Sequence, residues 1–303
     1  MDDCWNTVSR GRVGAALQYL AMGEVFVGTE AIARGTVTRH ELARWYRPIY
    51  PNVYALRGRE LSLADRAIGA WLWSKRTGIV TGTAASALYG ADWLDSDVGV
   101  ELIYNNTRPP TGIVARNERI AHDEFSSEGL TIATPARTAF DLGRFLKRGP
   151  AIARMDALMR ARPFSIEDVL VLAKRYRGAR GVKLLTDALP LVDGGAASPR
   201  ETWLRLLFID GGLPRPATQV PIVGPNGRVL RTVDMVWEEF MILVEYDGDQ
   251  HRTSREQYVK DLRVIPELER LGWIVLRVIK EDHPGDIVRR ARCALVARGW
   301  HPN

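Results

Sequence analysis

The chain has 303 residues, a formal net charge of +6 and an apolar share of 46%, as in an ordinary globular protein. This length exceeds the usual size of one domain, so two or three domains are expected. The absence of a long apolar run argues against a membrane span, and the first residues lack a signal-peptide pattern. Cys4 and Cys293 are too few for a disulfide framework or a cysteine zinc site, so a cytoplasmic location is expected.

The positive charge is concentrated in the first two thirds of the chain. Ser198–Asn303 holds 16 Lys and Arg against 15 Asp and Glu, which leaves 26 against 21 for Met1–Ala197. A basic N-terminal part is compatible with a polyanionic partner such as DNA.

Residues 1–58 have the pattern of a small helical unit followed by a hairpin. Val13–Met22 and Thr29–Ala33 predict two helices, and Thr38 can cap a third over Arg39–Tyr46. Arg47–Leu56 alternates like a short hairpin or wing. Three helices and a wing predict a winged helix-turn-helix, in which the last helix enters the major groove of DNA.

Residues 59–191 predict an α/β middle domain without a recognisable catalytic motif. Helices are expected at Leu61–Lys75, Thr83–Tyr89, Thr134–Leu146, Gly149–Arg160, Ser165–Arg175 and Gly181–Leu189, and strands at Val98–Tyr104, Gly112–Val114 and Leu130–Ala133. The tryptophans of the first two domains are expected in the core rather than as stacking platforms for nucleic acid: Trp5, Trp45, Trp71, Trp73 and Trp93.

Val192–Pro199 is rich in small residues and marks a boundary before a third domain, residues 198–303. Ser198 can cap a helix that has Pro199 at its first position. Two apolar runs, Val229–Trp237 and Phe240–Tyr246, predict a hairpin. A helix over Ser254–Leu271, kinked or broken at Pro266 and closed by Gly272, and a strand over Trp273–Val278 complete a mixed α/β core.

Several acids interrupt these strands. Asp234 lies in the first run, and Glu245 and Asp247 share one face of the second because side chains alternate along a strand. Carboxylates crowded on a buried sheet repel one another, so a hard divalent cation, Mg²⁺ or Mn²⁺, is expected among them. The alternative is that the acids line a solvated edge or pair with nearby arginines.

The order D-x(10)-E-x-D-G-x-x-H, a D-x-R helix and L-x-x-L-G-W-x-V-L-R-V resembles an endonuclease-like domain of unknown function related to the very-short-patch mismatch repair endonuclease. That group belongs to the PD-(D/E)XK nuclease superfamily, so a restriction-endonuclease-like core is implied. The resemblance covers Ser198 to Ile279 and includes S-P-R-E-T-W-L-R-L-L and G-L-P-R-P…Q.

The resemblance implies roles for the acids in cleaving a phosphodiester bond. Asp234 is expected as the main metal ligand and Glu245 as the second, with the carbonyl of Tyr246 completing the shell. Asp247 occupies the place where the superfamily has a lysine. Glu201 is expected to complete the metal cluster, although an acid in a first turn also suits the helix dipole.

The mismatch-repair relatives also lack that lysine and place a histidine nearby. His251 is therefore expected to activate water or stabilise charge, with Gln250 orienting the groups around it. Asp261 is expected to orient His251 or the metal-bound water, and Lys260 is a less favoured substitute for the lysine.

The first two domains resemble AbiEi-type antitoxins in the segments G-x-V-T-R-H-E-L…Y-R-P-I-Y-P-N-V-Y, T-G-T-A-A-S-A-L-Y-G and L-T-I-A-T-P-A-R-T-A-F-D-L. This resemblance implies that Arg39, His40 and Arg44 lie on the helix that meets DNA, with Arg47 near the wing. The alternative is a structural domain whose arginines are only solvated.

Two functions follow from these patterns. The first is a divalent-metal-dependent DNA endonuclease, acting in DNA repair or defence and guided by its N-terminal DNA-binding domain. The second is a non-catalytic DNA-binding regulator of the antitoxin type with a degenerate nuclease fold. Whether the chain forms a homodimer or has a partner toxin stays open, as does the type of DNA substrate.

Overall fold

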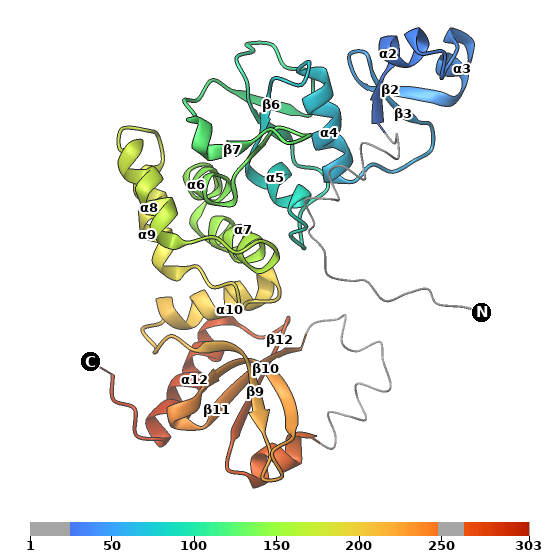
Figure 1. Cartoon of the computed structure of the whole chain (residues 1–303). Helices are drawn as coiled ribbons and strands as arrows, with labels where there is room; N and C mark the ends of the chain where they lie inside the picture. Colours follow the sequence, from blue (N-terminus) through green and yellow to red (C-terminus); the bar gives the residue numbers. More distant parts are fainter. Residues whose placement is uncertain (1–24, 248–263, 303) are drawn as a thin grey trace, which may run out of the picture. The chain divides into compact units, whose positions relative to one another are not determined.

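The computed structural model describes residues 25–247 and 264–302, and the chain divides into two compact units, Met1–Pro190 and Leu191–Asn303 (Figure 1). Both units mix helices and strands, so the chain is of the mixed α/β class. The boundary predicted near residue 58 stays a prediction. In the described part of the chain, none of the helices is long and apolar enough to cross a membrane.

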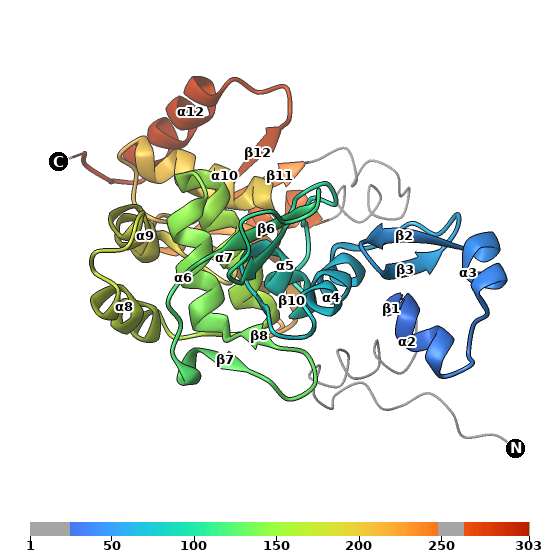
Figure 2. The same ribbon diagram turned by 90° about the horizontal axis from the view of Figure 1, so that it is seen from above.

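Among the described residues, the first unit begins with a small antiparallel sheet of order β1-β3-β2. The helix predicted over Val13–Met22 lies outside the described residues. Its elements are β1 (Val25–Val27), α2 (Gly28–Ala33), α3 (Arg39–Trp45), β2 (Tyr46–Tyr50) and β3 (Val53–Leu56) (Figure 2). Thr38 caps α3 as predicted, since its side chain accepts from Glu41 N at 3.2 Å. In α3, Leu42 is buried and the other side chains are exposed.

A second sheet of the first unit has the order β6-β5-β4-β8-β7. Helix α4 (Leu63–Trp73) precedes the first strand of this sheet. The strands and the helices between them are β4 (Ile79–Val80), α5 (Gly82–Leu88), β5 (Val100–Ile103), β6 (Ile113–Arg116), η1 (His122–Glu124), β7 (Phe125–Ser126) and β8 (Ile132–Ala133). A single hydrophobic cluster joins Val53 of the small sheet, Ile68 of α4 and Leu102 of β5.

Helix α6 (Pro135–Phe145) lies at the centre of the helical half of this unit and packs against α5. It also packs against α7 (Arg148–Ala161), α8 (Ile166–Arg175) and α9 (Val182–Ala188), and η2 (Leu189–Leu191) follows. Thr134 caps α6 with Pro135 at its first position, as predicted. Phe140 and Leu142 of this helix are fully buried.

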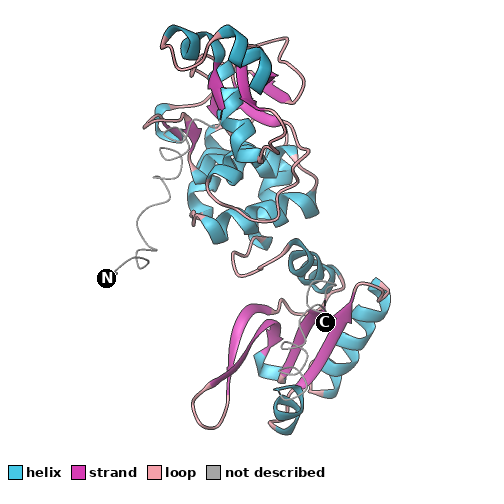
Figure 3. Cartoon of the chain, turned by 90° about the vertical axis from the view of Figure 1, so that its right-hand side faces the viewer, coloured by secondary structure: helices cyan, strands magenta, loops and turns pink. Residues whose placement is uncertain are grey.

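The second unit is built on a four-stranded sheet of order β12-β11-β10-β9, drawn in magenta in Figure 3. Its elements are α10 (Pro199–Asp210), β9 (Ala217–Val223), β10 (Val229–Trp237), η3 (Glu238–Phe240), β11 (Ile242–Asp247), a helix over 264–270, β12 (Ile274–Ile279) and α12 (Pro284–Ala297). The predicted hairpin is confirmed, because β10 pairs antiparallel with β11, whereas β12 pairs parallel with β11.

Helices cover both faces of this sheet. Met235 and Val244 pack in one cluster with Phe208 of α10 and Leu295 of α12. Val236 and Leu243 belong to a second cluster, which contains Leu268 of the helix over 264–270. Adjacent residues of one strand enter different clusters because side chains alternate between the two faces.

Two tryptophans expected in the core are exposed instead. Trp45 is 52% exposed at the end of α3, and its ring lies 4.8 Å from the guanidinium carbon of Arg44. Trp93 is 49% exposed because it lies in the loop between α5 and β5. Trp71 is buried and Trp73 packs against the core, as expected. Trp5 lies outside the described residues.

Candidate functional site

The carboxylate of Glu201 lies in the first turn of α10, the helix that packs on one face of the sheet of the second unit. Ser198 caps this helix, and its hydroxyl accepts from Glu201 N at 3.2 Å. The side chain folds back, so that Glu201 Oε2 accepts from Ala197 N at 2.9 Å. Only 7% of Glu201 is exposed, so its charge is largely removed from water.

Asp234 of β10 joins Glu201 through Gln219 of β9. Gln219 Nε2 donates to Glu201 Oε2 at 3.0 Å and lies 3.4 Å from Asp234 Oδ1. The other oxygen, Asp234 Oδ2, accepts from the backbone N–H of Tyr246 at 2.8 Å. Two predicted site acids, from a helix and a strand, are therefore held in one hydrogen-bonded group.

The electrostatics of this group penalise negative charge. Burial raises the pKa of Glu201, and the neighbouring carboxylate of Asp234 raises it further, against the hydrogen bonds that favour the ionised form. Two neighbouring carboxylates, of which Glu201 is buried and Asp234 half-buried, gain stability from a proton or from a bound cation. This is the electrostatic condition under which a metal site forms.

Glu245 and Asp247 of β11 are engaged differently. Glu245 forms an ion pair with Arg231 of β10, and Asp247 forms one with Arg277 of β12 at 2.5 Å. The side chains of these two acids are 14% and 18% exposed. Glu245 and Asp247 therefore pair with nearby arginines, which is the alternative to metal binding. Within the part of the chain that the structure describes, no group of three His, Cys, Asp or Glu side chains could hold a metal ion.

The rest of the predicted catalytic set lies outside the described residues: Gln250, His251, Lys260 and Asp261. Of the predicted helix over Ser254–Leu271, residues 264–270 are described and helical, and Pro266 lies among them. Gly272 closes this helix as predicted, with a φ of +92° that favours glycine.

A second candidate surface lies on α3 of the first unit. Arg39, His40 and Arg44 are exposed on this short helix, whose only buried residue is Leu42. Arg47 is half-buried at the start of β2, and its guanidinium donates to the carbonyl of Arg59 at 3.2 Å. The predicted DNA-contacting residues thus fall into an exposed group on the helix and a more constrained arginine beside it.

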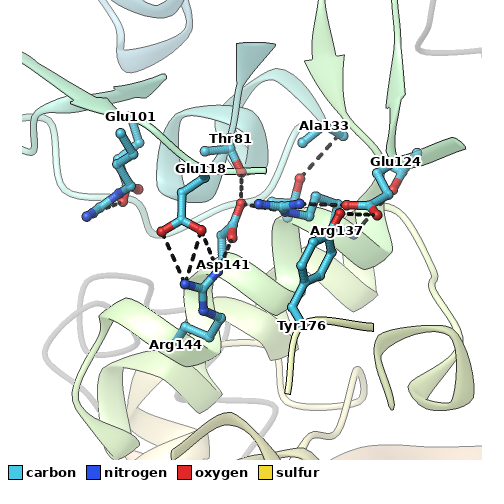
Figure 4. Close-up of polar contacts among 12 residues, drawn as sticks. Thr81, Glu101, Glu118, Glu124, Ala133, Arg137, Asp141, Arg144 and Tyr176 are labelled. Atoms are coloured by element: carbon cyan, nitrogen blue, oxygen red, sulfur yellow. Dashed lines mark hydrogen bonds and ion pairs between the residues drawn. The ribbon is translucent and has the colours of Figure 1, made fainter. Parts of the chain in front are cut away.

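A buried charge network on α6 was not anticipated from the sequence. Arg137 is fully buried and forms ion pairs with Glu124 at 2.5 Å and with Asp141 at 3.1 Å. Figure 4 shows its guanidinium group between these two acids. Asp141 also accepts from the hydroxyl of Thr81 at 2.6 Å. Burial lowers the pKa of Arg137, but Asp141 and Glu124 outweigh this effect, so that the pKa is raised and the guanidinium stays charged.

The network extends to the C-terminal end of α8 and to the loop that follows β6. Tyr176 donates its hydroxyl to Glu124 at 2.7 Å, and Arg144 pairs with Glu118 at 3.2 Å. The signal in the sequence is the spacing of Arg137, Asp141 and Arg144, which places three charges on one side of an otherwise apolar helix. Because these charges bind one another, the network acts as a structural tie between elements.

Comparison with known proteins found no family model that matches the chain. An uncharacterized protein of Mycobacterium tuberculosis is 32% identical over 219 residues, which cover 72% of this chain and 78% of the relative. It is named Rv2248 in strain H37Rv and MT2308 in strain CDC 1551.

Proposed function

Because this chain belongs to the family of the uncharacterized Mycobacterium tuberculosis proteins Rv2248 and MT2308, whose names give no activity, we propose its function from its own geometry. The chain is a divalent-metal-dependent DNA endonuclease with its reaction site in Leu191–Asn303. The observation that supports this proposal is the convergence of the buried Glu201 and the half-buried Asp234 in one hydrogen-bonded group.

The arrangement of the strands supports an endonuclease-like core for the second unit. An antiparallel run of β9, β10 and β11 is extended by β12, which pairs parallel with β11, and α10 and α12 cover one face. Asp234 lies near the end of the strand pair, next to the backbone of Tyr246. This mixed sheet agrees with the core that the resemblance to the mismatch-repair endonuclease implies.

The donor chemistry of the group fits Mg²⁺ or Mn²⁺, which prefer oxygen ligands. Asp234 and Glu201 would hold the cation, and Glu245 would join them on releasing Arg231. When bound, the cation supplies Lewis acidity that lowers the pKa of water and offsets charge on a phosphate. The role of the chain is to orient the two carboxylates through Gln219 N–H and Tyr246 N–H.

Guidance to DNA is assigned to the first unit. The order β1-α2-α3-β2-β3, with β2 and β3 as a hairpin, suits a winged helix-turn-helix in which α3 enters the major groove. The exposed guanidinium groups of Arg39 and Arg44 on α3 suit contacts to phosphate oxygens. The excess of basic residues in Met1–Ala197 favours the same partner.

A non-catalytic regulator is the second candidate, and the ion pairs of β11 favour it. With Arg231 on Glu245 and Arg277 on Asp247, two of the predicted metal ligands have their charge offset by the chain itself. A degenerate nuclease fold that only binds DNA would have this property. The two candidates therefore differ in whether a divalent cation changes what the protein does to DNA.

A cleavage assay separates the two candidates. Purified protein is incubated with supercoiled, nicked, mismatched and single-stranded DNA, each with Mg²⁺, Mn²⁺ or EDTA. The nuclease proposal predicts metal-dependent cleavage that Asp234→Asn abolishes, while the Arg39→Ala/Arg44→Ala variant retains the site but binds DNA less tightly. Sequence-selective binding without cleavage of any substrate under either metal would favour the regulator instead.

A further inference from the structure

Trp45, the last residue of α3, and Leu56, the last residue of β3, are two large apolar residues exposed next to each other. They are 52% and 48% exposed. The backbone brings them together, because Tyr46 pairs with Leu56 across β2 and β3. In addition, Arg57 N donates to the carbonyl of Trp45 at 2.9 Å. Exposed apolar residues are ordinary when they occur singly, whereas adjacent ones are typical of a surface that binds a partner.

The charges around this apolar pair are positive. The guanidinium carbon of Arg44 lies 4.8 Å from the centre of the Trp45 ring. Arg57 is exposed, and its guanidinium donates to a backbone carbonyl of α3 at 3.0 Å. Among the residues that the structure describes, neither arginine pairs with an acid, and the only acid of α3, Glu41, is held in the capping box. Both guanidinium groups are therefore available to the phosphates of a nucleic acid.

Trp93 has a similar exposure but the opposite charge around it. It is 49% exposed in the loop between α5 and β5, and the same loop contains Asp92, Asp95 and Asp97. Arg154 pairs with Asp95 at 2.5 Å, so the acids remain in excess. A polyanion is repelled by such surroundings and attracted by the arginines beside Trp45. Charge therefore distinguishes two tryptophans that exposure alone does not.

We propose that Trp45 is a stacking platform for an unpaired base of DNA, with Arg44 and Arg57 on the phosphates that flank this base. The proposal rests on the proposed function, which places DNA on the first unit, and it names the class of substrate: single-stranded DNA or a duplex with a mismatch. Bases in a matched duplex stack on one another, so only an unpaired base offers a free face to an indole ring. Such stacking accepts any base, because every base has a π-face.

Fluorescence anisotropy of the full chain with labelled DNA tests the proposal. In EDTA, which prevents metal-dependent cleavage, Trp45→Ala is expected to bind a single strand about 5- to 150-fold more weakly than the wild type, as the loss of one stacked base implies. Its affinity for a matched duplex is expected to stay within about twofold, which also shows that the variant is folded. Trp45→Phe keeps an aromatic ring and is expected to recover most of the affinity. Trp93→Ala is the matched control and is expected to bind both DNAs like the wild type.

Photocrosslinking locates the base on the protein. A single strand that contains bromouracil is irradiated with the full chain, and the crosslinked peptide is identified by mass spectrometry. The expected peptide contains Trp45, and the crosslink is expected to disappear in Trp45→Ala. A crosslink confined to other peptides would contradict the proposal.

The outcomes distinguish this proposal from the proposed function. If Trp45→Ala binds a single strand as tightly as the wild type, the stacking proposal is wrong and the proposed function stands. If Trp45→Ala weakens the binding of single-stranded and matched DNA by the same factor, Trp45 only holds Arg44 in place and the stacking proposal is again wrong. If the wild type binds neither DNA, the guidance assigned to the first unit fails and the stacking proposal fails with it.

Discussion

Arg231 on β10 and Glu245 on β11 form an ion pair across two neighbouring strands, with side chains that are 20% and 14% exposed. The pair determines whether Glu245 is available to a cation, because the same carboxylate cannot fully satisfy both partners. Glu201 and Asp234 differ from Glu245, because the neutral amide of Gln219, rather than an arginine, contacts them. The acids of this sheet therefore fall into a group bridged by Gln219 and a group paired with arginines.

Replacing Arg231 tests whether Glu245 belongs to the cation site. In Arg231→Gln the carboxylate of Glu245 loses its positive neighbour, so Mn²⁺ affinity measured by calorimetry is expected to rise. Breaking a partly buried pair is also expected to destabilise the fold by about 1–3 kcal/mol in urea titrations. For the change in stability, Arg277→Gln is the control, because Arg277 is 49% exposed and its pair with Asp247 is better screened by solvent. Unchanged or weaker Mn²⁺ binding by Arg231→Gln would remove Glu245 from the proposed ligands.

The raised pKa of Glu201 predicts a pH dependence of stability. A carboxyl whose folded pKa lies above its unfolded value contributes stability that is present below the unfolded pKa and is lost as pH rises through the folded pKa. In metal-free buffer, Glu201→Gln is therefore expected to gain stability relative to the wild type as pH rises from about 4 to 7. Urea denaturation of both proteins across this range measures the difference. A difference that stays constant with pH would mean that burial and Asp234 do not perturb Glu201.

The exposed arginines of α3 predict a salt-dependent affinity for DNA. Removing two phosphate contacts in Arg39→Ala/Arg44→Ala is expected to weaken binding to all sequences and to reduce the slope of log K against log salt by about 2. Fluorescence anisotropy with a labelled duplex at several salt concentrations gives both quantities. Lys174→Ala/Arg177→Ala removes the same charge from the exposed end of α8 and the turn after it, and it should leave the slope unchanged. Equal effects of the two double variants would assign binding to net charge rather than to α3.

The network around Arg137 predicts a large loss of stability when it is broken. Arg137→Met leaves the buried carboxylates of Glu124 and Asp141 without their shared cation, which is expected to cost about 3–5 kcal/mol. Urea denaturation followed by circular dichroism measures this loss. Arg175 also pairs with Glu124, but its side chain is 37% exposed. The loss of stability in Arg175→Ala should therefore be clearly smaller than in Arg137→Met. A cost under about 1 kcal/mol for Arg137→Met would mean that the network does not stabilise the fold.

The local pattern of the chain predicted most elements. The run Val229–Trp237 is strand β10 with the same bounds, and Ser165–Arg175 is α8 with Ser165 as its cap. These elements have strong local signals: a continuous apolar run, or a capping residue ahead of an amphipathic pattern. Strand β9, which supplies Gln219, was not assigned as a strand because Pro221 interrupts its pattern.

The site could be predicted only in part, because its geometry depends on tertiary contacts. The sequence identified Glu201 and Asp234, but it gave no sign that Gln219 links them, since that contact requires a left-handed backbone in a strand. The local sequence pattern likewise did not predict which arginines pair with Glu245 and Asp247. Arg231 and Arg277 reach those acids from neighbouring strands, and strand register is set by the whole sheet.

The most direct test of the central claim is an anomalous difference map from a crystal of the full chain soaked in Mn²⁺. The account predicts a peak at about 2.0–2.3 Å from a carboxylate oxygen of Asp234, with Glu201 as a neighbouring ligand. It also predicts that crystals of Asp234→Asn soaked in the same way lack this peak. A soaked wild-type crystal with Mn²⁺ bound elsewhere and no peak between Asp234 and Glu201 would contradict the account.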